Sequence, residues 1–328
     1  SNEDNSNPTL TDVTFDGNTA ESELGGTAAG GMHNRSSSPS LTNVTFKDNS
    51  ASYIGGGMVN EVGSSPTLEN VTFSGNSADY GGAMLNRDSN SNPTLTHVTM
   101  SHNIALGQGG AIGNTGTPVI TNSILWGNTG GEIYNIFGAP VITHSIVQGG
   151  HLGTGNLDQD PLLGPLQDNG GFTQTMALGD GSPAINAAQD TNCPATDQRG
   201  VARPLGSHCD MGAYEYDNST VDVFIGDTSM GSYLLAPQQS QRQSYPGKNG
   251  GPVRLTNTDG ASIMAAERVI YKVKGVNTSF TEMMGLPGTQ LDTTYWFPWY
   301  NNVELDTQLR FGNVSNTTAT VHVYIGGV

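Results

Sequence analysis

Few residues of this chain have the types and the spacing that catalysis on a polysaccharide requires. A glycoside hydrolase needs two or three carboxylates that converge on one face, and we expect Asp16 and Asp48 to stack on neighbouring repeats of the chain. The corresponding positions in later repeats are Ser74, Ser101 and Trp126, which supply no further carboxylate. We therefore interpret the two aspartates as solvated turn residues and not as a catalytic pair.

A polysaccharide lyase would need a basic side chain beside a carboxylate-bound calcium ion. Arg35, Lys47 and Arg87 fall in different loops of the predicted fold, so the sequence offers no such arrangement. Asp158 and Asp160, in LDQDP, are weak candidates for a calcium pair, and we prefer to interpret them as caps of turns. We predict no catalytic residue, no resident metal ion and no cofactor.

Histidine and cysteine give no stronger indication of a reactive site. The seven histidines show no paired spacing of metal ligands, and we expect His97 and His102 to face solvent. The chain has two cysteines, Cys193 and Cys209, in a segment rich in glycine and proline. A metal site would need more ligands than this segment offers, so we predict a disulfide.

An internal repeat determines which elements carry these residues. Four segments of 14 residues are nearly identical: NPTLTDVTFDGNTA (7–20), SPSLTNVTFKDNSA (38–51), SPTLENVTFSGNSA (65–78) and NPTLTHVTMSHNIA (92–105). Prolines at positions 8, 39, 66, 93, 118 and 140 give periods of 31, 27, 27, 25 and 22 residues, which are typical of a solenoid. Short runs of interleaved apolar and polar residues, broken by glycine and asparagine, predict a parallel β-helix with one turn for each repeat.

Stacking of the repeats predicts columns of like side chains. The interior columns are Leu10, Leu41, Leu68 and Leu95; Val13, Val44, Val71 and Val98; and Phe15, Phe46, Phe73 and Met100. Two asparagine columns are expected to form hydrogen-bonded ladders of structural importance. They are Asn18, Asn49, Asn76, Asn103 and Asn128, and Asn34, Asn60, Asn86, Asn114 and Asn135.

Composition and charge exclude some classes of protein. The formal net charge is −17, which repels phosphate backbones, so we expect no nucleic-acid partner. No apolar run is long enough to span a membrane. The chain opens on the polar SNEDN, as the mature form of a secreted protein would.

The repeat resembles the right-handed parallel β-helix proteins of bacterial surfaces. DPLLGPLQDNGGFTQTMALGDGSPAINAA (160–188), TDQRGVARP (196–204) and CDMGAYEY (209–216) are similar to the segment that closes such helices, often called a choice-of-anchor Q type domain. The resemblance covers residues 1–217 and implies an exported, surface-attached protein. It implies no reaction.

After Tyr216 the sequence shows no repeat of 20 to 30 residues. TVDVFIG (220–226), GPVRLTNT (251–258), SIMAAERVIYKV (262–273), DTQLRFGNV (306–314) and TATVHVYIGG (318–327) predict antiparallel strands of an immunoglobulin-like β-sandwich. The phrases YWFPWYNN and LRFGN resemble C-terminal modules of Chloroflexota-type surface proteins. Trp296, Trp299 and Tyr300 could stack on sugars or lie in an interface. The last strand echoes the first, so we predict subunit contacts by Thr320, Val321, Val323, Tyr324 and Ile325.

The sequence thus predicts an all-β protein with the turns of a parallel β-helix in 1–157, a segment that closes this β-helix in 158–217 and a β-sandwich in 218–328. Only SNEDNS precedes the first repeat, so we expect an uncovered N-terminal end and a C-terminal end covered by the closing segment. We predict a non-enzymatic, extracellular structural protein that forms a head-to-tail filament. The alternatives are a glycan-binding adhesin and a polysaccharide lyase or hydrolase.

Overall fold

The computed structural model describes residues 1–21, 28–217, 219–225, 227–235, 241–245, 253–257, 266–273 and 276–284. The chain divides into two compact units, Ser1–Tyr216 and Asp217–Val328. The described residues form strands and loops, with one short 3-10 helix, η1 (Asp190–Asn192). No helix within these ranges has the length and apolarity needed to cross a membrane.

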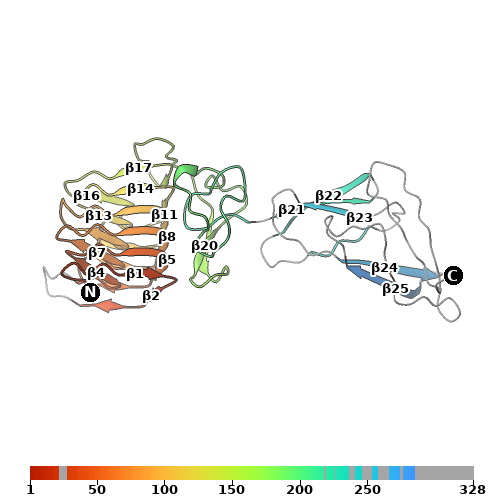
Figure 1. The fold of residues 1–328 in the computed structure, drawn as a ribbon, viewed down its shortest axis with the longest axis horizontal. Helices are drawn as coiled ribbons and strands as arrows, with labels where there is room; N and C mark the ends of the chain where they lie inside the picture. Colours follow the sequence, from red (N-terminus) through yellow and green to blue (C-terminus); the bar gives the residue numbers. More distant parts are fainter. Residues whose placement is uncertain are drawn as a thin grey trace. The chain divides into compact units, whose positions relative to one another are not determined.

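A parallel β-solenoid forms the larger part of unit Ser1–Tyr216 (Figure 1). Its walls are parallel sheets of nine, five and four strands, which we call the long, the five-stranded and the four-stranded sheet. The long sheet contains β1 (Thr9–Thr11), β2 (Thr14–Asp16), β5 (Ser40–Lys47), β8 (Thr67–Ser74), β11 (Thr94–Ser101), β14 (Val119–Thr121), β15 (Ile124–Trp126), β17 (Val141–Thr143) and β18 (Ile146–Val147). The five-stranded sheet contains β4 (Met32–Arg35), β7 (Met58–Glu61), β10 (Met84–Asn86), β13 (Ile112–Asn114) and β16 (Ile133–Asn135). The four-stranded sheet contains β3 (Thr19–Ala20), β6 (Ser50–Ala51), β9 (Ser77–Tyr80) and β12 (Ile104–Gln108).

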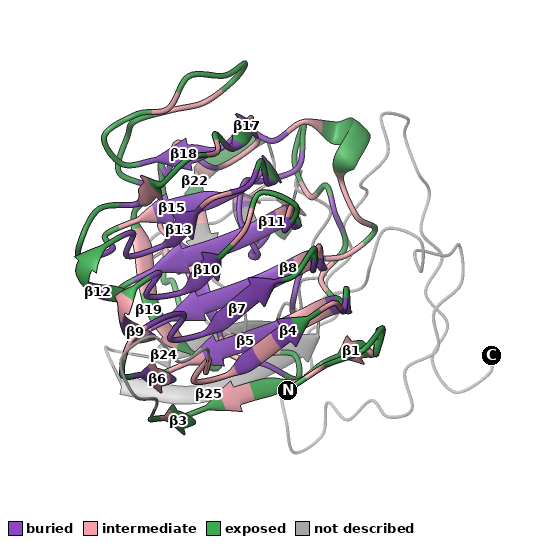
Figure 2. Ribbon diagram, turned by 90° about the vertical axis from the view of Figure 1, so that its left-hand side faces the viewer, coloured by how far each residue is buried: buried purple, intermediate pink, exposed green. Residues whose placement is uncertain are grey.

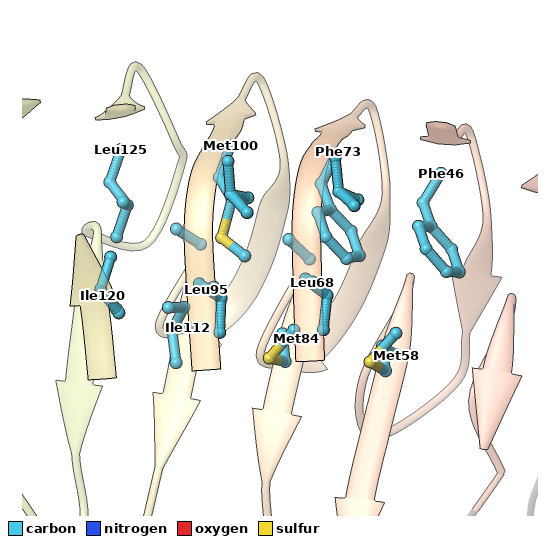
Figure 3. Close-up of a cluster of buried hydrophobic side chains, with 14 of the residues drawn as sticks. Phe46, Met58, Leu68, Phe73, Met84, Leu95, Met100, Ile112, Ile120 and Leu125 are labelled. Carbon is cyan, nitrogen blue, oxygen red and sulfur yellow. The ribbon is translucent and has the colours of Figure 1, made fainter. Parts of the chain in front are cut away.

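Strand register follows the sequence repeat and fills the interior. Leu41, Val44 and Phe46 of β5 pair with Leu68, Val71 and Phe73 of β8, which in turn pair with Leu95, Val98 and Met100 of β11. The rings of Phe15, Phe46 and Phe73 stack with 4.6 Å between neighbouring centroids. Figure 3 shows Phe46, Phe73, Leu68 and Leu95 beside Met58 and Met84 of the five-stranded sheet, and all six belong to one buried cluster. The predicted interior columns are confirmed.

A column of left-handed residues bends each turn of the long sheet. Leu41 and Val44 both point inward although they lie three positions apart, which a straight strand does not allow because successive side chains alternate. The residue before the valine position has a positive φ, between 47° and 58°, and this restores the inward direction. The column contains Asp12, Asn43, Asn70, His97, Asn122 and His144. These are the residue types, glycine apart, that adopt this conformation most readily.

Residues 158–216, which we call the flanking segment, lie on the outer face of the long sheet beside the solenoid (Figure 1). Outward-facing threonines of three successive strands hold it there. Thr45 Oγ1 donates to the Gln174 carbonyl at 2.7 Å, and Thr72 Oγ1 donates to Gln198 Oε1 at 2.7 Å. The Ala213 N–H donates to Thr99 Oγ1 at 3.0 Å. The prediction that this segment covers the C-terminal end is therefore wrong, because its polar and apolar contacts are with the side of the helix.

A second apolar core joins the flanking segment to the long sheet. At the outward position occupied by threonine in earlier turns, the later turns carry Ile124 and Ile146. Both are buried against Leu178, Ala184 and Met211 of the flanking segment. The segment also contains the hairpin of β19 (Leu163–Gln167) and β20 (Thr175–Leu178). The Cys193–Cys209 disulfide, with 6.3 Å between the Cα atoms, closes its last part, as predicted.

Unit Asp217–Val328 contains antiparallel strands in its described residues. The strand β21 (Ser219–Ile225) pairs with β22 (Thr228–Leu235) and β23 (Val253–Asn257). A separate pair is formed by β24 (Ala266–Val273) and β25 (Val276–Met284). The strands predicted at 220–226, 251–258 and 262–273 correspond to β21, β23 and β24, whereas those predicted at 306–314 and 318–327 lie outside the described residues.

Candidate functional site

The first asparagine ladder, Asn18 to Asn128, lies at the corner between the long and four-stranded sheets. Its interior members have the same three bonds in every turn. The Asn76 side-chain amide donates to Asn103 Oδ1 at 2.8 Å and to the Phe46 carbonyl at 2.9 Å, and the Asn76 backbone N–H donates to Asn103 Oδ1 at 3.1 Å. Asn49 and Asn103 repeat this pattern with Phe15 and Phe73. Each interior amide is fully buried, so the ladder satisfies polar groups that water cannot reach.

The second ladder, Asn34 to Asn135, follows the end of the five-stranded sheet. Each side-chain amide donates to Oδ1 of the asparagine in the next turn, at distances from 2.9 to 3.4 Å. The structure adds Asn2 at the head of this ladder, where its amide donates to Asn34 Oδ1 at 2.8 Å. Both ladders therefore have the same direction, with donors pointing toward the C-terminal end.

The N-terminal end of the solenoid is an open edge among the described residues. The strands β1 and β2 pair with β5 alone, and β3 pairs with β6 alone. Leu10, Val13 and Phe15 are the counterparts of fully buried residues, yet they are only partly covered. Figure 2 shows the change from buried middle strands to exposed or partly buried residues in β1 and β3. Such an edge, with unpaired backbone groups and partly exposed apolar side chains, has the features that favour pairing with a further strand.

Two features end the solenoid at its C-terminal side, along the long sheet and at the first ladder, whereas β16 pairs with β13 alone among the described residues. Residues 154–157 run parallel to the last strand of the long sheet, where the His144 N–H donates to the Thr154 carbonyl at 2.8 Å and the Val147 N–H donates to the Leu157 carbonyl at 3.0 Å. Glu132 ends the first ladder, because its carboxylate accepts the Asn128 side-chain amide at 2.6 Å and the Asn128 N–H at 3.1 Å. Burial raises the pKa of Glu132.

The register corrects two predictions about charged residues. Asp16 lies beside Lys47, not Asp48, and its carboxylate forms an ion pair with Lys47 Nζ at 3.1 Å. Arg35 and Arg87 are not scattered, because both contact the buried Glu61 carboxylate, each at 3.0 Å. Strands β4, β7 and β10 bring them together, since each residue ends or follows the equivalent strand of successive turns. These pairs join turns and gather no second carboxylate for catalysis.

His97 is buried, so the prediction that it faces solvent is wrong. It belongs to the left-handed column, where the flanking segment covers it, and Asn122 Nδ2 donates to its Nε2 at 3.1 Å. Burial, assisted by the nearby Arg203 charge, lowers the pKa of His97 to about 3. His102 is exposed, as expected. The repeat could have indicated the position of His97, because it aligns His97 with Asn70 and Asn122 of the neighbouring turns.

A buried ionic cluster within the flanking segment escaped prediction. Arg203 Nη1 contacts Glu215 Oε2 at 3.0 Å, and Arg199 Nη2 contacts Asp197 Oδ2 at 2.7 Å. All four side chains are at most 2% exposed, so neither pair is accessible to a substrate. Burial and the neighbouring Glu215 charge raise the pKa of Asp210 to about 7. The cluster organises the phrases TDQRGVARP and CDMGAYEY into one folded block.

The remaining candidates give no metal site within the described ranges. Asp158 Oδ1 accepts a hydrogen bond from the Gly149 N–H at 3.0 Å, and Asp160 Oδ1 accepts one from the Leu162 N–H at 2.9 Å. Each carboxylate therefore caps the backbone of a turn. No group of three or more His, Cys, Asp and Glu side chains in that part of the chain is arranged so that it could hold a metal ion. The predicted stacking or contact residues Trp296, Trp299, Tyr300, Thr320, Val321, Val323, Tyr324 and Ile325 lie outside the described residues.

Comparison of the chain with protein-family models, with curated proteins and with solved structures finds no match.

Proposed function

We propose that this protein is an extracellular structural protein of the cell surface that assembles head to tail into a filament. The observation that carries the proposal is the open N-terminal edge, where β1, β2 and β3 each have a partner on one side only among the residues that the structure describes. At the opposite end, residues 154–157 extend the long sheet and Glu132 ends the first ladder, whereas β16 has β13 as its one partner among the described residues. The two ends therefore differ, and contacts between unlike surfaces continue into open chains unless they close into a ring.

Several features support a structural and extracellular role. The stacked core and both asparagine ladders make a stiff rod, and the Cys193–Cys209 disulfide fits an oxidising compartment. The resemblance noted in the sequence favours a right-handed solenoid and surface attachment. The antiparallel strands of unit Asp217–Val328 support an immunoglobulin-like sandwich as the connecting module. In this proposal the connecting module of one copy supplies a strand to the open edge of the next.

The test compares the full-length protein with a variant that blocks the edge. Alternate residues of β1 face β5, and the Asp12 N–H donates to the Thr42 carbonyl, so the Thr11 N–H points away from β5. Thr11→Pro removes that outward donor without removing a bond to β5. We expect filaments in electron micrographs of the unchanged protein and single subunits for the variant, with similar melting temperatures. Subunits that stay separate at all concentrations in the unchanged protein would contradict the proposal.

A further inference from the structure

The open edge presents an incomplete copy of the bonding pattern that every interior turn completes. In an interior turn, Oδ1 of the first-ladder asparagine accepts two bonds from the preceding turn, one from a backbone N–H and one from a side-chain amide. Its own amide also donates back to a carbonyl of the preceding turn, as Asn49 does to Phe15 at 3.0 Å. Three bonds therefore connect each ladder asparagine to the turn before it.

Asn18 has these groups available at the edge. Its amide donates to Asn49 Oδ1 at 2.8 Å, which uses one of its two N–H bonds. Among residues 1–21 and 28–217, no group donates to Asn18 Oδ1, and the side chain is exposed whereas Asn49, Asn76 and Asn103 are fully buried. Asn2 repeats the arrangement in the second ladder, with its amide bound to Asn34 and its Oδ1 free of a donor in the same part of the chain.

The direction of the ladders decides which surfaces fit this edge. Two N-terminal ends that face each other would bring acceptor oxygens together, because both present Oδ1. The C-terminal end fits no better through the first ladder, since Glu132 offers a carboxylate and both oxygens already accept bonds from Asn128. Through the first ladder, neither described end of a second solenoid therefore repeats the two donors that an interior turn supplies to Oδ1.

We infer that the open edge binds a parallel strand, supplied by a second copy of this chain, that carries an asparagine opposite Asn18. The inference rests on the proposed function for the source of the strand. The asparagine amide and its backbone N–H donate to Asn18 Oδ1, and the strand accepts the second Asn18 amide bond at a carbonyl. Apolar residues of the strand cover Leu10, Val13 and Phe15, which the described chain leaves half-buried.

Asparagine is required because both polar atoms of its side chain are used. Aspartate has no N–H to donate and would place a carboxylate against Asn18 Oδ1, an acceptor–acceptor contact. A lost bond that leaves polar groups unpaired costs about 1–3 kcal/mol, which corresponds to a loss of roughly tenfold or more in affinity. The edge therefore selects by chemistry and not by shape alone, because the two side chains have nearly the same size.

A peptide with the sequence of residues 65–78, SPTLENVTFSGNSA, is a suitable probe because this segment already stacks on another turn of the solenoid. Its binding to the full-length protein is measured by fluorescence anisotropy, beside the same peptide with Asn76→Asp. We expect the asparagine peptide to bind at least about tenfold more tightly. On the protein, Asn18→Ala should weaken binding of the asparagine peptide, and Asn90→Ala, on the exposed flank, should not.

The outcomes separate this inference from the proposed function. Equal affinity of the two peptides, or binding of neither, overturns the inference even if the protein forms filaments. Selective binding by a protein that remains monomeric supports the asparagine-selective edge and contradicts the homopolymer. If Asn18→Ala fails to fold, the comparison of the two peptides on the unchanged protein still decides the question.

Discussion

The replacement Asn76→Asp tests the contribution of the first ladder with almost no change in volume. Asn76 is fully buried in the middle of the ladder. The replacement removes the amide that donates to Asn103 Oδ1 at 2.8 Å and to the Phe46 carbonyl at 2.9 Å. It retains an oxygen that accepts the Asn49 amide and N–H. The effect therefore comes from two lost donors and a buried charge, not from a cavity.

The magnitude follows from these bonds. Each lost bond that leaves a buried partner costs about 1–3 kcal/mol, although Asn103 Oδ1 keeps the bond from the Asn76 N–H. We expect the free energy of unfolding to fall by roughly 3–5 kcal/mol at neutral pH. Urea denaturation at several pH values is the assay, and part of the loss should be recovered in acid, where the protonated carboxyl donates one bond.

Position along the ladder supplies the internal control. The same change at Asn18, on the open edge, should cost less, because its side chain is exposed. At Asn128 it should cost more, because the new carboxylate would face Glu132. A loss below about 1 kcal/mol for Asn76→Asp, or equal losses at all three positions, would refute the account of the ladder.

Three further changes test other parts of the structure. Lys47→Ala should alter the unfolding free energy by less than about 1 kcal/mol, because its partner Asp16 is 55% exposed; a lost polysaccharide-cleaving activity would contradict the non-enzymatic reading. Replacing Cys193 and Cys209 by serine should cost about 3 kcal/mol in chemical denaturation, and thiol labelling of the unfolded, unreduced protein should find no free thiol. Because the pKa of His97 is lowered to about 3, its neutral imidazole contributes stability that is fully present above a pH of 6.5. This contribution is lost as the pH falls from 6.5 toward about 3. His97→Asn, the residue of neighbouring turns, should therefore lose about 3 kcal/mol less than the unchanged protein between a pH of 6.5 and about 4; equal acid sensitivity would contradict this.

The repeat made the solenoid predictable, because side chains in the same column must satisfy the same contacts in each turn. Leu41, Val44 and Phe46 could be assigned to the interior from their recurrence alone. The register of Asp16 was misjudged by one residue, since Asp48 occupies a left-handed turn position with a φ of 54°. Position within a turn depends on local backbone conformation, which residue type indicates only when the whole column is considered.

The placement of the flanking segment was not predictable, because its contacts join residues far apart in the sequence. Thr72 meets Gln198 across 126 positions, and an outward threonine in a strand gives no sign of its partner. The change from threonine to Ile124 and Ile146 in later turns was the available signal for a covered face. The ends of the ladders were also missed, because Asn2 precedes the first repeat and Glu132 replaces the alanine that stands at its position in earlier turns, Ala83 and Ala111.

Hydrogen exchange of the N-terminal strands tests whether the open edge is the surface through which copies of the protein assemble. The full-length protein is compared under dilute and concentrated conditions, with peptides that cover β1, β2 and β3. We predict that amides pointing away from β5 and β6, including that of Thr11, become protected on assembly, and that Thr11→Pro abolishes the change in the rest of the edge. Assemblies in which these strands exchange as fast as in the dispersed protein would contradict the account, because their contacts would lie elsewhere.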